Sequence, residues 1–112
     1  MREFRKLNVW QKGLNLAKDT YLFSNELNDE KHYSLADQIR RSAISIPSNI
    51  AEGSSRRSDK EYYRFMEIAL GSSFELETQL LIAESFTQKE VTDLLERNVE
   101  LQKMISGFMR AL

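Results

Sequence analysis

The sequence predicts an all-α protein, an antiparallel up-down-up-down four-helix bundle whose second helix is kinked at a proline. Two observations lead to this prediction. Four long segments carry apolar residues at the spacing of one helix face, and short polar connections separate these segments. No internal repeat or low-complexity stretch competes with this organisation. We expect the helices at residues 7–27, 33–53, 58–85 and 88–111.

Length and composition indicate one ordered domain spanning residues 1–112. Because 41% of the residues are hydrophobic and only one is proline, we do not expect disorder. The chain contains no cysteine, which excludes disulfide bonds and thiolate metal sites. No apolar run is long enough to span a membrane, and the basic N-terminal segment lacks the apolar region of a secretion signal. We therefore expect a cytoplasmic protein without a membrane contact.

The first expected helix has a broad apolar surface. One stripe along it contains Trp10, Gly13, Leu14, Ala17 and Tyr21. A second stripe beside the first contains Val9, Leu16, Phe23 and Leu27. Together the two stripes are wider than a helix needs in order to cover one neighbour.

The second expected helix keeps one apolar face through a proline. Its apolar residues recur at spacings of three or four, at Leu35, Ile39, Ala43, Ile46 and Ile50. Because this phase continues through Pro47 without a slip, we expect the proline to kink the helix without ending it. Gly53 is expected to stop the helix, since the residue just past a helix often needs a positive φ.

A further apolar stripe on the second helix is interrupted only by Arg40. A four-helix monomer buries one stripe per helix, so this extra flank indicates contact with another subunit. The alternative is that the broad stripes only enlarge the core of one subunit. We expect self-association, and the predicted oligomer contacts are Ala36, Ile44, Pro47 and Ala51.

The third expected helix has a clear start signal and an unusual centre. Ser58 and Glu61 have the spacing of a capping box, in which each side chain satisfies a free backbone N–H. Gly71 in the middle of the helix costs about 1 kcal/mol relative to alanine. We interpret the small pair Gly71-Ser72 as a site of close approach by another helix.

The fourth expected helix repeats the capping-box spacing at Thr87 and Glu90. From residue 91 its apolar positions follow a heptad that runs to residue 112. Asn98 interrupts this heptad, and a single polar residue in such a seam can fix the register of packed helices.

No catalytic or metal-binding pattern stands out in the chain. His32 is the only histidine and lies among polar residues, which indicates a surface side chain. Glu75, beside the apolar face of the third helix, is expected to pair with Arg40 or Arg41 rather than to bind a metal. We therefore expect no enzymatic activity, no cofactor, no metal and no small-molecule substrate.

Charge is unevenly distributed along the chain. Residues 1–57 carry ten Lys/Arg and seven Asp/Glu, a balance of +3, whereas residues 58–112 carry six and ten, a balance of −4. The candidate contacts for nucleic acid or another partner are Arg40, Arg41, Arg56 and Arg57. No aromatic residues interleave with these arginines, which argues against sequence-specific binding of single strands.

Three stretches of the sequence resemble one known family: QIRRS at residues 38–42, SIPSNIAEG at 45–53 and ELETQL at 75–80. They closely resemble the signature of bacterial four-helix-bundle proteins labelled 23S rRNA intervening-sequence proteins. The resemblance implies a homopentameric barrel. One branch of that family serves as an accessory protein to retroelement reverse transcriptases.

These observations predict a non-enzymatic helical scaffold that self-assembles, as a pentamer by the resemblance, and binds a protein or ribonucleoprotein partner. The alternative is an RNA-binding protein, associated with ribosomal RNA, that uses the four arginines. We rank the scaffold first because the family label reflects the genetic location of its members rather than an activity.

Overall fold

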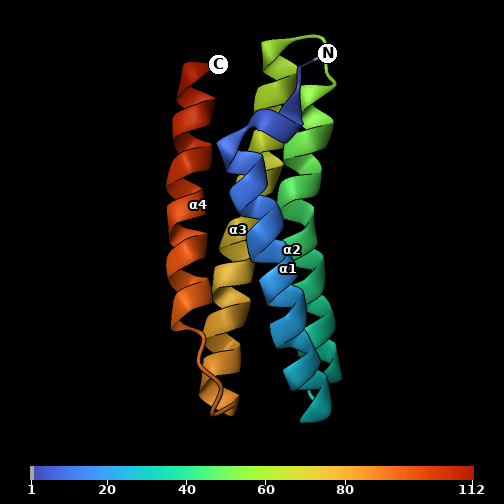
Figure 1. Cartoon of the computed structure of the whole chain (residues 1–112), viewed down its shortest axis with the longest axis vertical. Coiled ribbons are helices and arrows are strands. Elements are labelled where there is room, and N and C mark those ends of the chain that lie inside the picture. The colour runs from blue at the N-terminus through green and yellow to red at the C-terminus, as the bar shows by residue number, and fades with distance from the viewer. Residues whose placement is uncertain (1) are drawn as a thin grey trace.

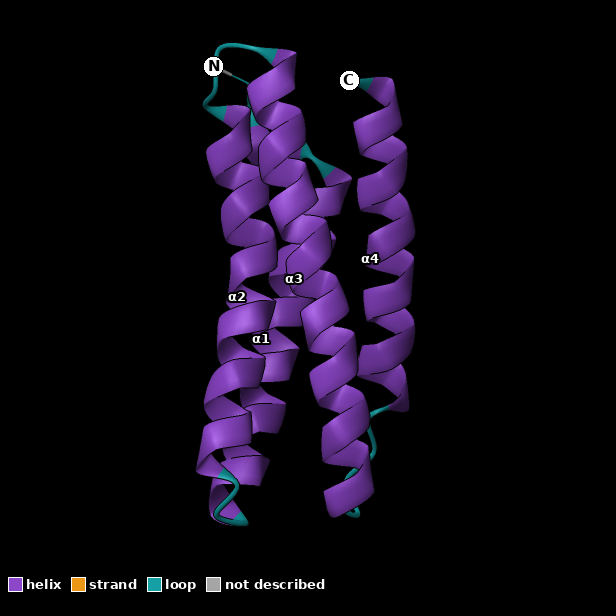
Figure 2. Cartoon of the chain, turned by 180° about the vertical axis from the view of Figure 1, so that it is seen from behind, coloured by secondary structure: helices purple, strands orange, loops and turns teal. Residues whose placement is uncertain are grey.

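Helices account for nearly all of the computed structural model, which describes residues 2–112. The elements are η1 (Phe4–Lys6, a 3-10 helix), α1 (Asn8–Asp29), α2 (Tyr33–Ser54), α3 (Asp59–Phe86) and α4 (Thr92–Ala111). Figures 1 and 2 show them from opposite sides, and the described part of the chain contains no strand. The prediction of an all-α four-helix bundle is confirmed. Its largest error in a helix boundary is at the start of α4, expected at residue 88.

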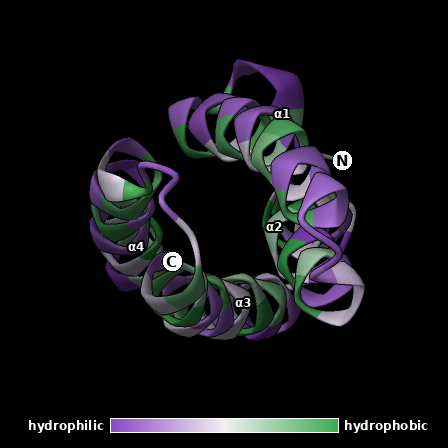
Figure 3. Ribbon diagram, turned by 90° about the horizontal axis from the view of Figure 1, so that it is seen from below, coloured by the Kyte–Doolittle hydropathy of each residue, from purple (hydrophilic) through white to green (hydrophobic). Residues whose placement is uncertain are grey.

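The four α-helices lie side by side along an axis of 44 Å. The three connections lie alternately at the two ends of the bundle, and both termini lie at the end that carries the α2–α3 connection (Figure 1). The most extensive packing is that of α2, against α1 and against α3. Figure 3, viewed along the bundle, shows α4 beside α3. The four helices therefore follow one another in chain order around the bundle, and the packing between α4 and α1 is the least extensive.

The core is built from the apolar faces that the sequence predicts. Its largest fully buried side chains include Leu16, Leu27, Ile39, Ile46, Ile50, Met66, Leu76, Leu80, Leu101 and Ile105. In α4 the predicted heptad holds as far as Ile105. Beyond it Met109 is buried, while Phe108 and Leu112 are only partly buried. A straight helix drifts by about 20° per heptad, so a strict seven-residue repeat leaves the core face towards the end of α4.

The helix α2 continues through Pro47 to Ser54, so the prediction that this proline does not end the helix is confirmed. The kink itself stays a prediction. Two polar side chains next to the proline bind carbonyls of the preceding turn. Ser48 Oγ donates to the carbonyl of Ile44 over 2.7 Å, and Asn49 Nδ2 donates to the carbonyl of Ser45 over 2.8 Å. These bonds add side-chain contacts to the turn in which Pro47 lacks a backbone donor.

Gly53 does not stop α2 by a positive φ, and that expectation is wrong. It lies inside the helix, and no glycine among residues 2–112 has a positive φ. A Cβ at Gly53 would lie 2.8 Å from Phe65 Cβ and 3.0 Å from Tyr62 Cδ1, so the glycine permits close packing of α2 on α3. Gly71 shows the reverse, because a Cβ there would meet nothing within 4 Å. Of the small pair Gly71-Ser72, the close approach therefore falls on Ser72, whose Oγ lies 2.8 Å from Ser45 Oγ of α2, and a second close approach occurs at Gly53.

The two predicted capping boxes have different outcomes. Ser58 caps α3 as expected, because its Oγ accepts a hydrogen bond from the N–H of Glu61 over 3.1 Å. The box at Thr87 and Glu90 is wrong, since α4 begins only at Thr92. Glu90 lies two residues before that start, and its carboxylate accepts the N–H of Thr92 over 3.0 Å. The hydrogen bond from the Thr92 hydroxyl and, after it, this backbone bond lower the pKa of Glu90.

Candidate functional site

An apolar groove of about 690 Å³ runs between α1 and α2 on the outside of the bundle. The side chains that α1 contributes are Trp10, Leu14, Ala17, Lys18, Tyr21 and Leu22. Those from α2 are Ile44, Pro47, Ser48 and Ala51, and η1 contributes Phe4. We call this surface the α1/α2 groove. Three of the four predicted oligomer contacts line it.

The broad apolar surface predicted for α1 explains the first wall of the groove. Its second stripe is buried in the core, where Leu16 and Leu27 are almost completely covered. The first stripe lies towards α2 and is covered only in part, so that Tyr21 remains 47% exposed. Leu22 next to it is 64% exposed. The prediction of a broad apolar surface on α1 is therefore confirmed, because part of this surface stays exposed in the single subunit.

The second wall of the groove comes from the extra stripe on α2. Ile44 is 47% exposed, and Pro47 and Ala51 line the groove beside it. Ala36, the fourth predicted oligomer contact, is fully buried and packs in the core instead. Ala36 lies about 12 Å along α2 from Ile44, beyond the α2 residues that line the groove. The predicted contact surface is therefore reduced to Ile44, Pro47 and Ala51.

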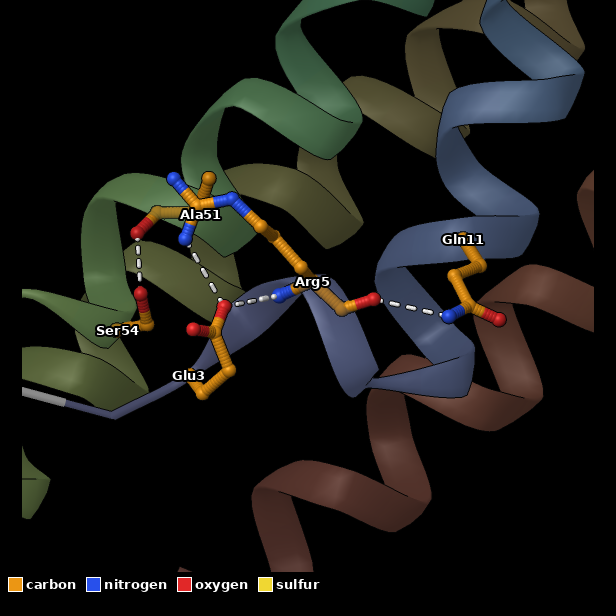
Figure 4. A network of polar contacts seen from close by, with 5 residues as sticks. All are labelled: Glu3, Arg5, Gln11, Ala51 and Ser54. Atoms are coloured by element: carbon orange, nitrogen blue, oxygen red, sulfur yellow. Dashed lines mark hydrogen bonds and ion pairs between the residues drawn. The ribbon is translucent and has the colours of Figure 1, made fainter.

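The N-terminal segment closes one end of the groove. The ring of Phe4 packs edge-on against Trp10 with centroids 5.1 Å apart. Figure 4 shows the polar contacts that hold this segment: Glu3 Oε1 accepts from the backbone N–H of Arg5 over 3.1 Å, and Gln11 Nε2 donates to the Arg5 carbonyl over 2.8 Å. The bond from the Arg5 backbone lowers the pKa of Glu3. The element η1 was not predicted, because three residues are too few to show a periodic pattern.

The four candidate arginines do not form one cluster. From Arg40 to Ser54 the helix rises by about 21 Å, so Arg40 and Arg41 are well separated from Arg56 and Arg57. Arg40 Nε donates to Ser24 Oγ over 2.7 Å. Its guanidinium lies 5.1 Å from the ring centroid of Tyr21, a residue of the groove. Acidic neighbours pair with two of the arginines, because Asp37 lies 3.3 Å from Arg41 and Glu52 lies 3.0 Å from Arg56.

The two other residues that the sequence singled out, Glu75 and His32, do not line the α1/α2 groove. Glu75 is exposed and forms no ion pair among residues 2–112, so the expected pairing with Arg40 or Arg41 is wrong. Residue Arg41 lies one turn from Asp37 on the same helix, and this nearer carboxylate pairs with it. His32 is partly buried against Phe86, with ring centroids 6.2 Å apart. No group of three His, Cys, Asp or Glu side chains in the described chain could hold a metal ion.

No helix that the structure describes has the length and hydropathy needed to cross a membrane.

Residues 5–107 match the family described as "23S rRNA-intervening sequence protein". None of the curated proteins matches the chain. A similar solved structure is the crystal structure of a protein with unknown function from the S23 ribosomal protein family of Bacteroides thetaiotaomicron. It is 26% identical, with a TM-score of 0.84, and the alignment covers 90% of this chain and 97% of that one. The chain belongs to the 23S rRNA-intervening sequence protein family.

Proposed function

We propose that the protein is a non-enzymatic scaffold that self-assembles through the α1/α2 groove and presents its outer surface to a protein or ribonucleoprotein partner. The observation that carries the proposal is the apolar lining of this groove, in which Lys18 is the only charged residue. An exposed apolar surface of this kind is typical of a protein contact.

The groove suits a protein surface better than a small substrate. A small-molecule site normally has several convergent polar groups that fix the orientation of its ligand. Here the polar groups of the lining side chains are those of Lys18, Tyr21, Ser48 and Trp10. The hydroxyl of Ser48 already donates to the carbonyl of Ile44. This leaves few groups to orient a ligand along a groove that spans two helices.

The number of subunits in the proposal comes from the family resemblance, which favours a pentamer. A ribonucleoprotein partner is favoured by the family description, which names the intervening sequence of 23S rRNA. Assembly would repeat each weak partner contact several times, and linked contacts bind far more tightly than one contact alone.

Size-exclusion chromatography with light scattering tests the self-assembly. We expect a single oligomeric species for the native chain and a smaller species for Ile44→Glu, since a carboxylate would have to be buried in the contact. Ile68→Glu is the matched control, because Ile68 is also an isoleucine that is 47% exposed and does not line the groove. A native chain that runs as a monomer at micromolar concentration would overturn the scaffold.

One observation favours RNA binding as a second candidate function. Arg57, Lys60 and Arg64 are exposed near the α2–α3 connection and form no ion pair within residues 2–112. Their spacing places Lys60 and Arg64 one turn apart on α3. Such unpaired cations attract phosphates without any specific motif. In this second candidate function, RNA would contact the end of the bundle that carries the α2–α3 connection.

A further inference from the structure

A second apolar groove, of about 370 Å³, lies between α3 and α4. Its apolar residues are Leu81, which is 49% exposed, and the partly buried Leu95 and Val99. Its charged residues are Glu77, Glu96, Glu100 and Lys103. We call this surface the α3/α4 groove. It shares no helix with the α1/α2 groove, and Figure 3 shows the two helix pairs on different sides of the bundle.

The two grooves carry opposite charge. Among residues 2–112, the α1/α2 groove is lined by one cation, Lys18, and by no acidic residue. The guanidinium of Arg40 lies over Tyr21 of this groove and adds a second cation. The α3/α4 groove is lined by three glutamates and one lysine. Of the glutamates, Glu100 pairs with Lys12 of the same subunit, whereas Glu96 forms no ion pair among the described residues.

Symmetry separates the ways in which two copies could meet. In an isologous contact each groove would face its own copy, so that a cationic groove would meet a second cationic groove, or an acidic groove a second acidic one. That contact would also leave the other groove exposed on every subunit. A head-to-tail contact instead covers both grooves with one type of interface and brings opposite charges together.

We infer that the α1/α2 groove of one subunit receives the α3/α4 face of the next copy, in a head-to-tail contact. This inference rests on the proposed self-assembly and identifies its second surface. Leu81 and its apolar neighbours meet Leu22 and Ile44, one from each wall of the α1/α2 groove. The glutamates of one subunit then lie near Lys18 and Arg40 of the next.

Complementation between two variants tests the inference. Ile44→Glu blocks the α1/α2 groove and leaves the α3/α4 groove intact, whereas Leu81→Glu does the reverse. Each variant alone is expected to be monomeric. When they are mixed, the intact groove of one meets the intact groove of the other, and the expected product is a 1:1 heterodimer that cannot grow. Sedimentation velocity should be run at about 0.1–1 mM chain, because a single contact lacks the avidity of a closed ring.

Controls and alternative outcomes decide between the two proposals. Ile68→Glu lies in neither groove and should retain the native assembly, and circular dichroism should show that all variants keep their helices. If Leu81→Glu keeps the native size, or if the mixture contains only monomers, the head-to-tail contact is overturned while self-assembly through the α1/α2 groove stands. If the native chain is itself a monomer, the proposed function fails first.

Discussion

Asn98 of α4 and Ser73 of α3 exchange two hydrogen bonds inside the core. Ser73 Oγ donates to Asn98 Oδ1 over 2.6 Å, and Asn98 Nδ2 donates to the Ser73 carbonyl over 2.9 Å. Both residues are completely buried. Because a shift of α4 along α3 would leave these polar groups unpaired in the core, the pair fixes the register of the two helices.

Removing this pair should reduce stability strongly. We expect Asn98→Ala to lower the free energy of unfolding by about 2–4 kcal/mol, because it creates a cavity and leaves the Ser73 hydroxyl without its partner. Urea unfolding measures this change. Asn15→Ala is the matched control on the exposed face of α1, where the change should be below about 0.5 kcal/mol. A double variant with Ser73→Ala should show coupling, and strict additivity would contradict a direct interaction.

Two glycines inside helices should respond to alanine in opposite ways. Gly53→Ala should lower the free energy of unfolding by about 1–3 kcal/mol, because the new Cβ would lie 2.8 Å from Phe65 Cβ. Gly71→Ala should raise it by about 0.5–1 kcal/mol, since the Cβ meets no atom within 4 Å and alanine favours the helix. Thermal unfolding of both variants checks the contrast. A stabilising Gly53→Ala would show that α2 and α3 can move apart at little cost.

The hydroxyl of Tyr62 should make stability depend on alkaline pH. It is buried without a hydrogen-bond partner among residues 2–112, and burial raises the pKa of Tyr62 above its ordinary value near 10, against the opposing charge of Arg2. The folded state therefore holds this proton more tightly than the unfolded state. The resulting stability is present below pH 10 and is lost as pH rises through the raised pKa.

Tyr62→Phe tests this account in urea unfolding between pH 7 and 11. At pH 7 we expect the free energy of unfolding to stay the same or to rise by about 1 kcal/mol, because the unpartnered hydroxyl is removed. Above pH 10 the variant should lose less stability than the native chain. Tyr63→Phe, at a position that is 42% exposed, should follow the native curve. A parallel loss in Tyr62→Phe would assign the alkaline effect to other groups.

Much of the fold could be predicted because helix periodicity is a local signal. The phase from Ile39 to Ile50 identified the buried face of α2 and its continuity through Pro47. The broad stripe on α1 also indicated an incompletely covered surface, which the structure shows as the α1/α2 groove. In both cases the information lies within one helix, so no knowledge of its neighbours was needed.

The errors concern contacts between elements that are distant in the sequence. Gly53 looked like a helix stop, because only the packed structure reveals how close Phe65 lies. Spacing along α2 places Ala36 on one flank with Ile44, yet Ala36 is fully buried in the packed subunit. The acidic α3/α4 groove was missed because Leu81 and Val99 come from different helices and form a surface only when these helices pack. Spacing along one helix could not reveal such pairs.

The last prediction concerns RNA, because it separates the two candidate functions. Arg40 and Arg41 lie far along α2 from Arg56 and Arg57, and the carboxylates of Asp37 and Glu52 already pair with two of the four. A split and partly neutralised set of cations on a chain of net charge −1 should bind structured RNA only weakly. We therefore expect filter binding at low salt that is lost by about 0.15 M salt.

Two double variants with equal charge changes locate any binding that is found. Arg56→Ala/Arg57→Ala removes cations near the α2–α3 connection, where Lys60 and Arg64 also lie, and should reduce the low-salt binding. Arg40→Ala/Arg41→Ala removes the same charge elsewhere on α2 and should have the smaller effect, since Arg40 is held by Ser24 and Tyr21. Sub-micromolar binding that survives 0.15 M salt and disappears in the first variant would rank RNA binding above the scaffold, because charge at one end of the bundle would then account for the affinity.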